Sequence, residues 1–529
     1  MSHQNKDVLT ATISNKANLI IGQDFSLTVT LKTKNLIKIQ SVNIIFTGAT
    51  KNISVPTGNL SLNLDGSTGY IATYTTVLTV SNHPNVIKEN DPIKFTIKVN
   101  GSDADPFVFT GTARTINPDS LSLMLNEVFL DTPNIEGSKP LTGKGAMVTT
   151  LLLDKAGNSL GNTPIFISSK VPEHLSACKI LKYDNITPIL PESIWSFSGL
   201  SINSDNEGNI KFYIHPQESD SMVLELESWI VGVGNPVSAN SPLFIVNTET
   251  PDILDTIPEP NILGGFPGPL TSDSGEPNFY VGVYYYPKAE TGDYILFFTK
   301  SLDKQGTKRE YSGHYVIVGN PKTELGLEKY SYSLPYDIFK VGVTYDFNYI
   351  VILGKSAGSI TSMPTSVTYM GGAIYNPPTN VTRDYDLCKV YTSLGIGKAE
   401  IQPDTGISYD SIKRYLDNPS TPNTGLFVEV LGGNNIAGKV PLNSKVTLNV
   451  YIQSSNCNTH KSWTLPMPIK VDSQGIASLP FHIPFEFLNK IYPYDNGGPG
   501  SIYFDYEFNI GNKKHYGKIW EGLIDTRSE

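Results

Sequence analysis

The chain has 529 residues, of which 17% are charged, 39% hydrophobic and 10% aromatic, and its formal net charge is -10. At about 150 residues per domain this length corresponds to three or four domains. The low charge content excludes a coiled coil and a charge-driven disordered chain. No cluster of Lys and Arg forms a phosphate-binding stripe, so nucleic acid is not an expected partner.

The cysteines and the N-terminus limit the class of protein further. Cys178, Cys388 and Cys457 lie far apart and form no Cys-x-x-Cys pair, so the sequence predicts neither a disulfide framework nor a zinc ribbon, and it implies no cofactor. The first apolar run, residues 19–21, is shorter than the hydrophobic region of a signal peptide. No apolar stretch reaches the ~20 residues of a membrane-spanning helix. Localisation stays open, and a cell-surface or extracellular location would require a non-classical route.

Period-two alternation dominates the first unit, residues 1–115. Apolar residues alternate with Ser and Thr over residues 25–31, and similar patterns recur at 60–64, 74–80 and 93–99. Alternation of this kind is typical of half-buried strands, because successive side chains point to opposite faces. We therefore predict an immunoglobulin-like sandwich here.

A second unit of the same type is predicted for residues 116–250. A strand runs into a Gly-Asn turn within residues 148–158, and a second turn of this kind lies in residues 204–209. Alternation then returns at 210–214 and 223–227. These signals again indicate a β-sandwich.

Residues 251–277 interrupt the strand pattern with six prolines and four glycines. Proline lacks the amide donor that a central strand needs. We therefore interpret this segment as an interdomain linker.

Two further units, residues 278–375 and 376–529, share an order of signals. Both contain a Ser-Leu-Pro-aromatic-x-Ile step, at 333–338 and 478–483, placed before a final pair of strands. The recurrence suggests a duplicated sandwich. Residues 376–425 fit the repeat poorly, and a capping residue followed by apolar residues at helical spacing predicts one short helix at 408–416.

Several turn motifs carry a resemblance to a known family. The second unit, through residues 151–158, 163–168 and 204–212, resembles the group 1 bacterial immunoglobulin-like domain of intimin and invasin. Residues 18–31 resemble a more distant member, and residues 471–477 are similar to the same Asp-x-x-Gly turn. The resemblance implies a series of β-sandwiches that act as binding or spacer modules, without naming a receptor.

The chain also departs from the family pattern. The resemblance leads us to expect a signal peptide, a lysin-motif anchor and a disulfide-stapled lectin-like tip, and none of these is recognisable in the sequence. The second unit is longer than the usual family domain, with an additional stretch from about Lys170 to Ser198. That insertion and the irregular segment 376–425 are the two non-repeating places where we expect function to be found. The third unit, at 281–284 and 291–295, resembles repeats that accompany such domains in large proteobacterial surface proteins.

The search for catalytic motifs favours a protein that is not an enzyme. The sequence contains no nucleophile elbow, Walker A loop, dinucleotide-binding glycine motif or His-Glu-x-x-His. Glu225 with Glu227 and Asp505 with Glu507 lie two residues apart on predicted strands, a separation that overlaps that of inverting glycosidases. Apolar neighbours fill the opposite faces, so we expect both pairs on the solvated side.

Two weak metal-site patterns were considered. Residues 457–460 have the Cys-x-x-His spacing of half a zinc site, but the remaining histidines are scattered, and an incidental loop is the expected interpretation. Asp103 and Asp105, with Asp252 and Asp255 in the linker, could supply carboxylate oxygens to calcium between domains. Solvated turn residues are the expected interpretation, and no metal site is predicted.

Tyr284 and Tyr286 are the binding candidates that the sequence offers. On a strand they would share a face, and outside the core they would present flat amphipathic rings to a sugar or a protein. The alternative places one or two of the three tyrosines at 284–286 in the core, with a ring over Pro287.

The sequence therefore predicts an all-β protein of tandem immunoglobulin-like sandwiches that form an elongated rod. The expected function is that of a non-enzymatic bacterial binding or adhesion-type protein with a protein or glycan partner. One alternative is a structural spacer or assembly subunit that self-associates through edge strands. Another is a carbohydrate-active enzyme with accessory sandwiches.

Overall fold

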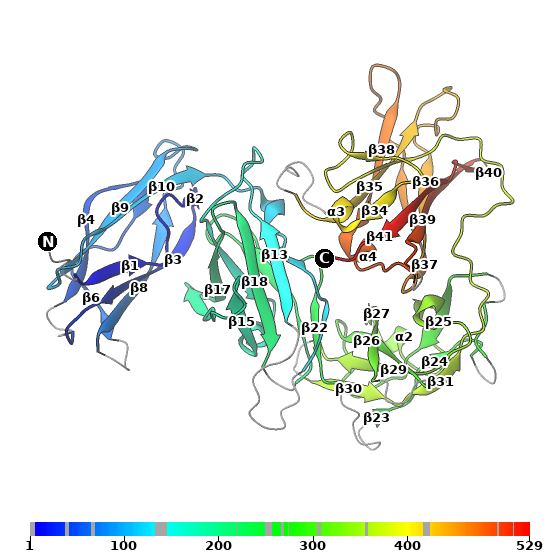
Figure 1. Cartoon of the computed structure of the whole chain (residues 1–529), viewed down its shortest axis with the longest axis horizontal. Coiled ribbons are helices and arrows are strands. Elements are labelled where there is room, and N and C mark those ends of the chain that lie inside the picture. Colours follow the sequence, from blue (N-terminus) through cyan, green and yellow to red (C-terminus); the bar gives the residue numbers. More distant parts are fainter. Residues whose placement is uncertain are drawn as a thin grey trace. The chain divides into compact units, whose positions relative to one another are not determined.

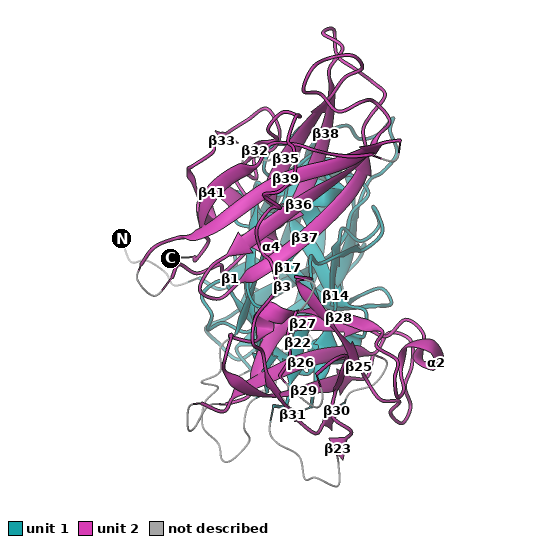
Figure 2. Cartoon of the chain, turned by 90° about the vertical axis from the view of Figure 1, so that its right-hand side faces the viewer, with its two compact units in different colours: residues 1–249, 355–359 teal, residues 250–354, 360–529 magenta. Residues whose placement is uncertain are grey.

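The computed structural model describes residues 6–37, 42–64, 69–132, 145–217, 220–248, 256–265, 269–272, 275–303, 308–354, 358–415, 424–494, 497–511 and 513–528. The chain divides into two compact units (Figure 2): unit 1 comprises residues 1–249 and 355–359, and unit 2 comprises residues 250–354 and 360–529. Both consist of β-sandwiches (Figure 1), which confirms the predicted all-β class. No helix among the described residues is long and apolar enough to cross a membrane.

The first sandwich has two facing sheets, with strand orders β1-β3-β8-β5, where β7 also pairs with β8, and β2-β10-β9-β4-β6. In β3 the predicted alternation is realised, since Phe25, Leu27, Val29 and Leu31 are all buried while their neighbours are partly exposed. The strands are β1 (Val8–Ala11), β2 (Asn18–Ile20), β3 (Asp24–Lys32), β4 (Asn43–Lys51), β5 (Ile53–Ser54), β6 (Leu60–Ser61), β7 (Asn63–Leu64), β8 (Ile71–Val80), β9 (Pro92–Asn100) and β10 (Phe107–Arg114).

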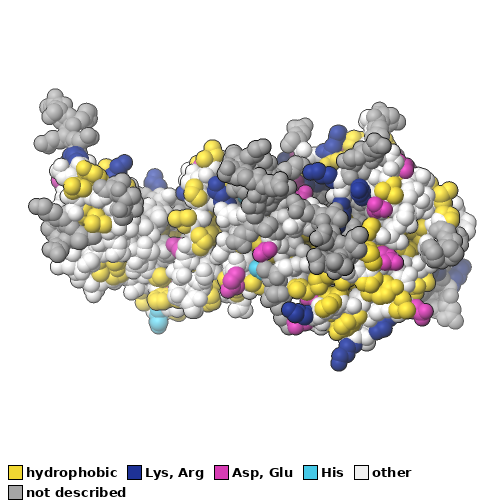
Figure 3. All heavy atoms as spheres, turned by 90° about the horizontal axis from the view of Figure 1, so that it is seen from below, with side chains coloured by type: hydrophobic (Ala, Val, Ile, Leu, Met, Phe, Trp, Pro, Cys, Tyr) yellow, Lys and Arg dark blue, Asp and Glu magenta, His cyan; other side chains and the backbone are white. Residues whose placement is uncertain are grey.

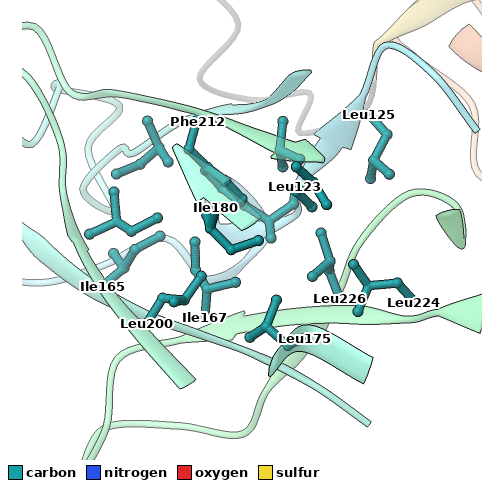
Figure 4. Packing of buried hydrophobic residues seen from close by; sticks show 14 of the residues in the cluster. Leu123, Leu125, Ile165, Ile167, Leu175, Ile180, Leu200, Phe212, Leu224 and Leu226 are labelled. Atoms are coloured by element: carbon teal, nitrogen blue, oxygen red, sulfur yellow. The ribbon is translucent and has the colours of Figure 1, made fainter. Parts of the chain in front are cut away.

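The second sandwich is built from sheets of order β11-β13-β18-β15, β12-β22-β19 and β16-β17-β14-β20-β21. Figure 4 shows Ile165 and Ile167 from β14 packed among Leu200 and Phe212 in its core. The elements are η2 (Pro118–Leu121), β11 (Met124–Leu125), β12 (Phe129–Asp131), β13 (Ala146–Leu151), β14 (Pro164–Ser169), α1 (Pro172–Ser176), β15 (Cys178–Lys182), β16 (Glu192–Ile194), β17 (Phe197–Asn203), β18 (Asn209–Pro216), β19 (Met222–Leu224), β20 (Leu226–Trp229), β21 (Val237–Ser238) and β22 (Leu243–Val246).

The Asp-x-x-Gly turns have one hydrogen-bond pattern at three places. The Oδ1 atom of Asp154 accepts from the backbone N–H groups of residues two and four positions further on, at 2.9 and 2.8 Å. Asp205 repeats this at 2.8 and 2.8 Å, and Asp472 repeats it at 2.8 and 2.9 Å. A short acceptor side chain at the first position is what organises such turns.

In unit 2 the third sandwich has sheets β23-β30-β29-β26-β27, where β31 also pairs with β29, and β24-β25-β28. Its elements are β23 (Thr256–Ile257), β24 (Asn261–Ile262), β25 (Asn278–Gly282), β26 (Tyr294–Ser301), β27 (Glu310–Ile317), α2 (Pro321–Glu324), β28 (Tyr332–Pro335), η4 (Tyr336–Ile338), β29 (Thr344–Ile352), β30 (Ser359–Ser362) and β31 (Thr365–Thr368).

Part of the predicted linker belongs to this sandwich. β23 and β24 lie inside residues 251–277, and each occupies the edge of a sheet. The missing proline amide excludes a central strand and still permits an edge strand, so the interpretation of the whole segment as a linker was wrong for these residues.

The fourth sandwich has sheets β33-β32-β35-β38 and β34-β41-β39-β36-β37, where β40 also pairs with β39. Its elements are β32 (Lys389–Tyr391), β33 (Glu400–Ile401), β34 (Gly406–Ser408), α3 (Tyr409–Ile412), β35 (Gly425–Gly432), β36 (Lys445–Gln453), β37 (Asn458–Pro466), β38 (Ala477–Pro484), α4 (Phe485–Leu488), β39 (Gly500–Ile510), β40 (Lys513–Tyr516) and β41 (Trp520–Asp525).

The third and fourth sandwiches share a pairing scheme. β25 pairs with β28 as β35 pairs with β38, and β26 lies between β27 and β29 as β36 lies between β37 and β39. The two Ser-Leu-Pro steps fall in the equivalent strands β28 and β38. The common topology supports the duplication that the sequence suggested.

Of the helix predicted at 408–416, only Tyr409–Ile412 form α3, where the Ser411 hydroxyl accepts from the backbone N–H of Ser408 at 3.2 Å, and residue 416 lies outside the described residues. The prediction of only one helix was wrong, because the described residues also contain α1, α2 and α4, each of four or five residues. Helices this short lack the apolar periodicity on which sequence interpretation depends.

Candidate binding surface

The first two sandwiches, both in unit 1, are held together by buried hydrogen bonds. The Gln23 amide donates to the carbonyl of Pro164 at 2.6 Å, and its side chain is 1% exposed. The backbone N–H of Asp24 donates to the carbonyl of Val231 at 2.8 Å. Buried amides paired in this way fix the relative position of the strands that carry them. The start of β3 in the first sandwich is therefore held in a fixed position against the second sandwich.

The insertion contains a β-hairpin that lies against β3. β16 and β17 are joined by the two residues Trp195 and Ser196, with Ile194 paired to Phe197. Ile194 is buried in a cluster that also holds Trp229. Phe197, 46% exposed, meets the Trp229 ring edge to face at 5.6 Å. One side of the hairpin is therefore packed, while its tip faces solvent.

Trp195 at this tip combines exposure with constraint. Its φ is +55°, in the left-handed region that favours glycine and costs a residue with a Cβ about 1–2 kcal/mol. Its indole N–H donates to Oδ2 of Asp24 at 2.9 Å, and Oδ1 of the same carboxyl accepts from the Thr79 hydroxyl at 2.6 Å. The side chain nevertheless stays 64% exposed. The fold thus fixes a large aromatic ring in solvent at an energetic disadvantage.

More apolar side chains lie on the connection between β15 and β16. Asp184 shapes this turn, since its carboxyl accepts from the backbone N–H of Ile186 and Thr187 and from the Thr187 hydroxyl. The Thr187 hydroxyl lowers the pKa of Asp184. Tyr183, Ile186 and Leu190 on the same connection are 72%, 78% and 77% exposed. A rigid turn therefore presents three large apolar side chains in the insertion.

A cavity of about 380 Å³ lies between the insertion and β3. Lys182, Lys211 and Glu192 line it, beside Phe25 and Ser26 of the first sandwich. Burial raises the pKa of Glu192, while a hydrogen bond from the Ser26 hydroxyl opposes the rise. Volumes of this size are typical of small-ligand sites.

Charge is mixed on one face of the molecule (Figure 3). On the face shown in Figure 3, Lys and Arg are interspersed with Asp and Glu, and hydrophobic side chains gather in patches between them. Large exposed apolar patches are typical of interaction surfaces.

The two tyrosines predicted from the sequence do not share an exposed face. β25 ends at Gly282, so residues 284–286 are not in a strand. Tyr286 is fully buried, and its hydroxyl donates to Asp293 at 2.9 Å. Its predicted surface role is therefore corrected, and it belongs to the core, as the alternative allowed. Tyr284 is half-buried, and Tyr285 is 58% exposed.

One carboxylate pair is likewise not where it was expected. Asp505 is fully buried, because it accepts from Nη2 of Arg383 at 2.7 Å and from Nδ2 of Asn449 at 2.9 Å. The expectation of a solvated side was wrong for this residue, since a distant arginine supplies its charge partner. Glu507 is half-buried and pairs with Lys514 at 2.9 Å.

The other pair, Glu225 and Glu227, is half-buried, and Glu225 forms an ion pair with Lys170 at 2.7 Å. Leu224 and Leu226 are buried as predicted. None of these four carboxylates lines the cavity beside β3.

The described residues of the two candidate metal sites make other contacts. His460 stacks on Tyr451 with ring centroids 4.3 Å apart, and burial lowers its pKa. Asp103 accepts from the backbone N–H of Asp7 at 2.8 Å, and Asp105 pairs with Lys6 at 2.9 Å. Asp252 and Asp255 lie outside the described residues. The described part of the chain holds no group of three or more His, Cys, Asp or Glu side chains able to bind a metal ion.

Sequence reasoning singled out the insertion but none of its residues. Trp195 and Glu192 face residues of the first sandwich more than 160 positions away, as the separation of 171 between Trp195 and Asp24 illustrates. The available signal was an aromatic pair, Trp195 and Phe197, at a two-residue interval inside a segment without repeat character.

The fold and this surface define a tandem β-sandwich protein with an inserted hairpin. No protein-family model and no curated protein matches the chain. Two solved structures to which it is similar are the D00-D0 domain of intimin, at 10% identity and a TM-score of 0.16, covering 45% of this chain and 100% of that one, and the D0-D1 domain of intimin, at 13% identity and a TM-score of 0.16, covering 46% and 100%.

Proposed function

We propose that this chain is a non-enzymatic binding protein of adhesion type, which contacts a protein or a glycan through the insertion of its second sandwich. One observation carries the proposal: Trp195 is held by a hydrogen bond in an unfavourable backbone conformation and still has 64% of its surface exposed. Strain retained at one position is characteristic of functional sites. Rigid exposed aromatic rings supply much of the binding energy at protein interfaces.

Trp195→Gly tests this role, because glycine suits the positive φ of the turn and removes only the ring. We expect the free energy of unfolding to change by less than about 1 kcal/mol, since relieved strain offsets the lost hydrogen bond. Binding to the partner should weaken at least about tenfold. Glycan arrays and affinity capture from envelope and host extracts would be run with the full chain and with this variant.

The matched control is Tyr285→Ala, which removes an exposed ring from unit 2. A ligand supports the proposal only if its binding falls in Trp195→Gly and persists in Tyr285→Ala. A ligand whose binding is lost only in Tyr285→Ala would place the binding site at Tyr285 instead of at the insertion. Absence of any ligand in both assays would contradict the proposal.

Assembly through an edge strand is a second candidate. β37 is nine residues long, ends one sheet of the fourth sandwich and pairs only with β36 among the described strands. Side chains from Lys461 to Pro466 are exposed, apart from Trp463. Unpaired edges of this length can add a strand from another copy.

If β37 associates with a second copy, the mass measured by light scattering should rise with concentration, and Leu465→Lys should restore the monomer because a charge on an edge opposes pairing. Leu465 is 39% exposed, so this change should leave the fold intact. A monomeric mass for the unmodified chain at all concentrations would exclude assembly.

A further inference from the structure

The cavity beside β3 differs from the exposed apolar tip because three charged residues, Lys182, Lys211 and Glu192, line it. Lys182 at the end of β15 and Lys211 on β18 line it from neighbouring strands, since Phe212 is the register partner of Lys182. Both side chains are exposed. Within the described part of the chain neither ammonium belongs to an ion pair, and Lys211 lies 5.6 Å from the centroid of the Tyr213 ring.

The single carboxyl in the cavity wall supplies an acceptor. Oε1 of Glu192 is buried and has no hydrogen-bond partner, although the Ser26 hydroxyl donates to the same carboxyl. A buried acceptor without a partner is costly, and a donor from a ligand would remove that cost. The amide of Asn203, also in the wall, already donates to the carbonyl of Thr12 at 2.8 Å.

Apolar groups complete the wall. Tyr183 and Leu190, 72% and 77% exposed, border the cavity on the side of the insertion. Flat or branched apolar groups of this kind pack against the C–H face of a ligand whose polar groups point elsewhere. The cavity thus combines two lysines that form no ion pair within the described residues, one buried acceptor without a hydrogen-bond partner, and an apolar border.

We propose that this cavity binds a sugar residue that carries a carboxylate. The carboxylate would pair with Lys182 and Lys211, a ring hydroxyl would donate to Glu192, and the apolar face of the ring would rest on Tyr183. Among the residues that line the cavity, two positive charges against one negative favour an anion, in a chain whose formal net charge is -10. Asp184, on which the charge of Lys182 also acts, does not line the cavity and already accepts from Ile186 and Thr187. A sugar acid fits better than a peptide carboxylate, because it joins one anionic group to several hydroxyl donors.

This assignment rests on the proposed binding function and names the ligand class for the same insertion. The probes are methyl glucuronide and the methyl glycoside of N-acetylneuraminic acid, each beside a glycoside in which the carboxyl is reduced to an alcohol. Binding to the full chain would be followed by saturation-transfer NMR and by titration calorimetry. We expect both acids to bind at least tenfold more tightly than their neutral counterparts, and added salt to weaken the acids alone.

The double variant Lys182→Gln with Lys211→Gln should bind the acids at least tenfold more weakly, and its binding of the neutral glycosides should be unchanged. Lys179→Gln is the matched control, because Lys179 lies on β15 and does not line the cavity. Glu192→Gln should weaken the neutral glycosides, and it should weaken the acids less, because it also removes the one negative charge of the cavity lining.

The outcomes separate the two proposals. Equal binding of acids and neutral glycosides, or no binding of either, overturns the assignment of the cavity. The binding function then still stands if some other ligand depends on Trp195. Acid binding that persists in the double lysine variant also overturns the assignment. Oligosaccharides that end in the same acids should bind more tightly than the free glycosides if the natural ligand is a glycan rather than a free sugar acid.

Discussion

Replacing Arg383 with Met is expected to destabilise the fourth sandwich by about 3–5 kcal/mol, because it leaves the carboxylate of Asp505 buried without a charge partner. In the native protein Nη2 of Arg383 lies 2.7 Å from Asp505, and the two side chains are 12% and 1% exposed. The guanidinium also donates to the carbonyls of Gly517 and Pro378 at 2.7 and 3.0 Å. Amide hydrogen exchange in β39, read by mass spectrometry, would measure the loss locally.

Two companion variants separate this cause from a general defect. Lys514→Met removes the partner of Glu507, which lies on the same strand β39, from a pair whose side chains are 50% and 25% exposed, and it should cost less than about 1 kcal/mol. Combining Arg383→Met with Asp505→Asn removes the uncompensated charge, so the double variant should recover part of the stability lost. A double variant less stable than Arg383→Met alone would contradict the electrostatic explanation.

Asp337→Asn is expected to abolish a fall in the stability of unit 2 between pH 4 and pH 8. Burial raises the pKa of Asp337 from 3.8 to about 7, although the backbone N–H of Asn458 donates to Oδ2 at 3.1 Å. Oδ1 is buried without a hydrogen-bond partner, as is the hydroxyl of Tyr375 close by. Burial raises the pKa of the Cys457 thiol, and the charge of Asp337 contributes to the rise.

The sign follows from proton binding. Between pH 3.8 and about 7 the folded chain keeps the Asp337 proton that the unfolded chain releases, so stability falls as pH rises. The difference amounts to roughly 4 kcal/mol, fully present below pH 3.8 and lost above pH 7. Asparagine cannot ionise, so the Asp337→Asn variant should not lose this contribution to the free energy of unfolding as the pH rises.

The free energy of unfolding would be measured in urea at several pH values for the wild type and for Asp337→Asn. The contributions of all other titrating groups cancel in the difference between the two proteins. The variant should match the wild type near pH 4 and exceed it by several kcal/mol at pH 8. Glu328→Gln, which removes an exposed carboxyl from the same sandwich, should give a difference that is flat with pH. A flat difference for Asp337→Asn would show that this carboxyl is ionised in the folded state throughout.

Both the hairpin and the cavity of the insertion depend on contacts with the first sandwich. Asp24 and Ser26 of β3 hold Trp195 and Glu192, which lie three residues apart in the insertion. A second sandwich expressed alone would lack these partners. The first sandwich is thus part of the candidate site, even though it contributes few exposed residues to it.

The sequence by itself determined the strand pattern. Alternation in residues 25–31 reports burial directly, since each side chain in a strand points to the face opposite its neighbour, and β3 buries the predicted residues. The Asp-x-x-Gly turns at Asp154 and Asp205 and the duplicated Ser-Leu-Pro step were also readable, because each depends on residues a few positions apart.

Only the tertiary structure decided which polar and aromatic groups are buried and which meet. The alternation of apolar and polar residues predicts that Asp505 is exposed. It is buried instead, because Arg383, 122 positions earlier, supplies a charge partner for its carboxylate. Tyr286 became a core residue because Asp293 accepts its hydroxyl hydrogen bond. Trp195 became a constrained surface residue through Asp24, 171 positions earlier. Local periodicity records the face of a strand, whereas these pairings depend on how distant strands pack, which no short stretch of sequence specifies.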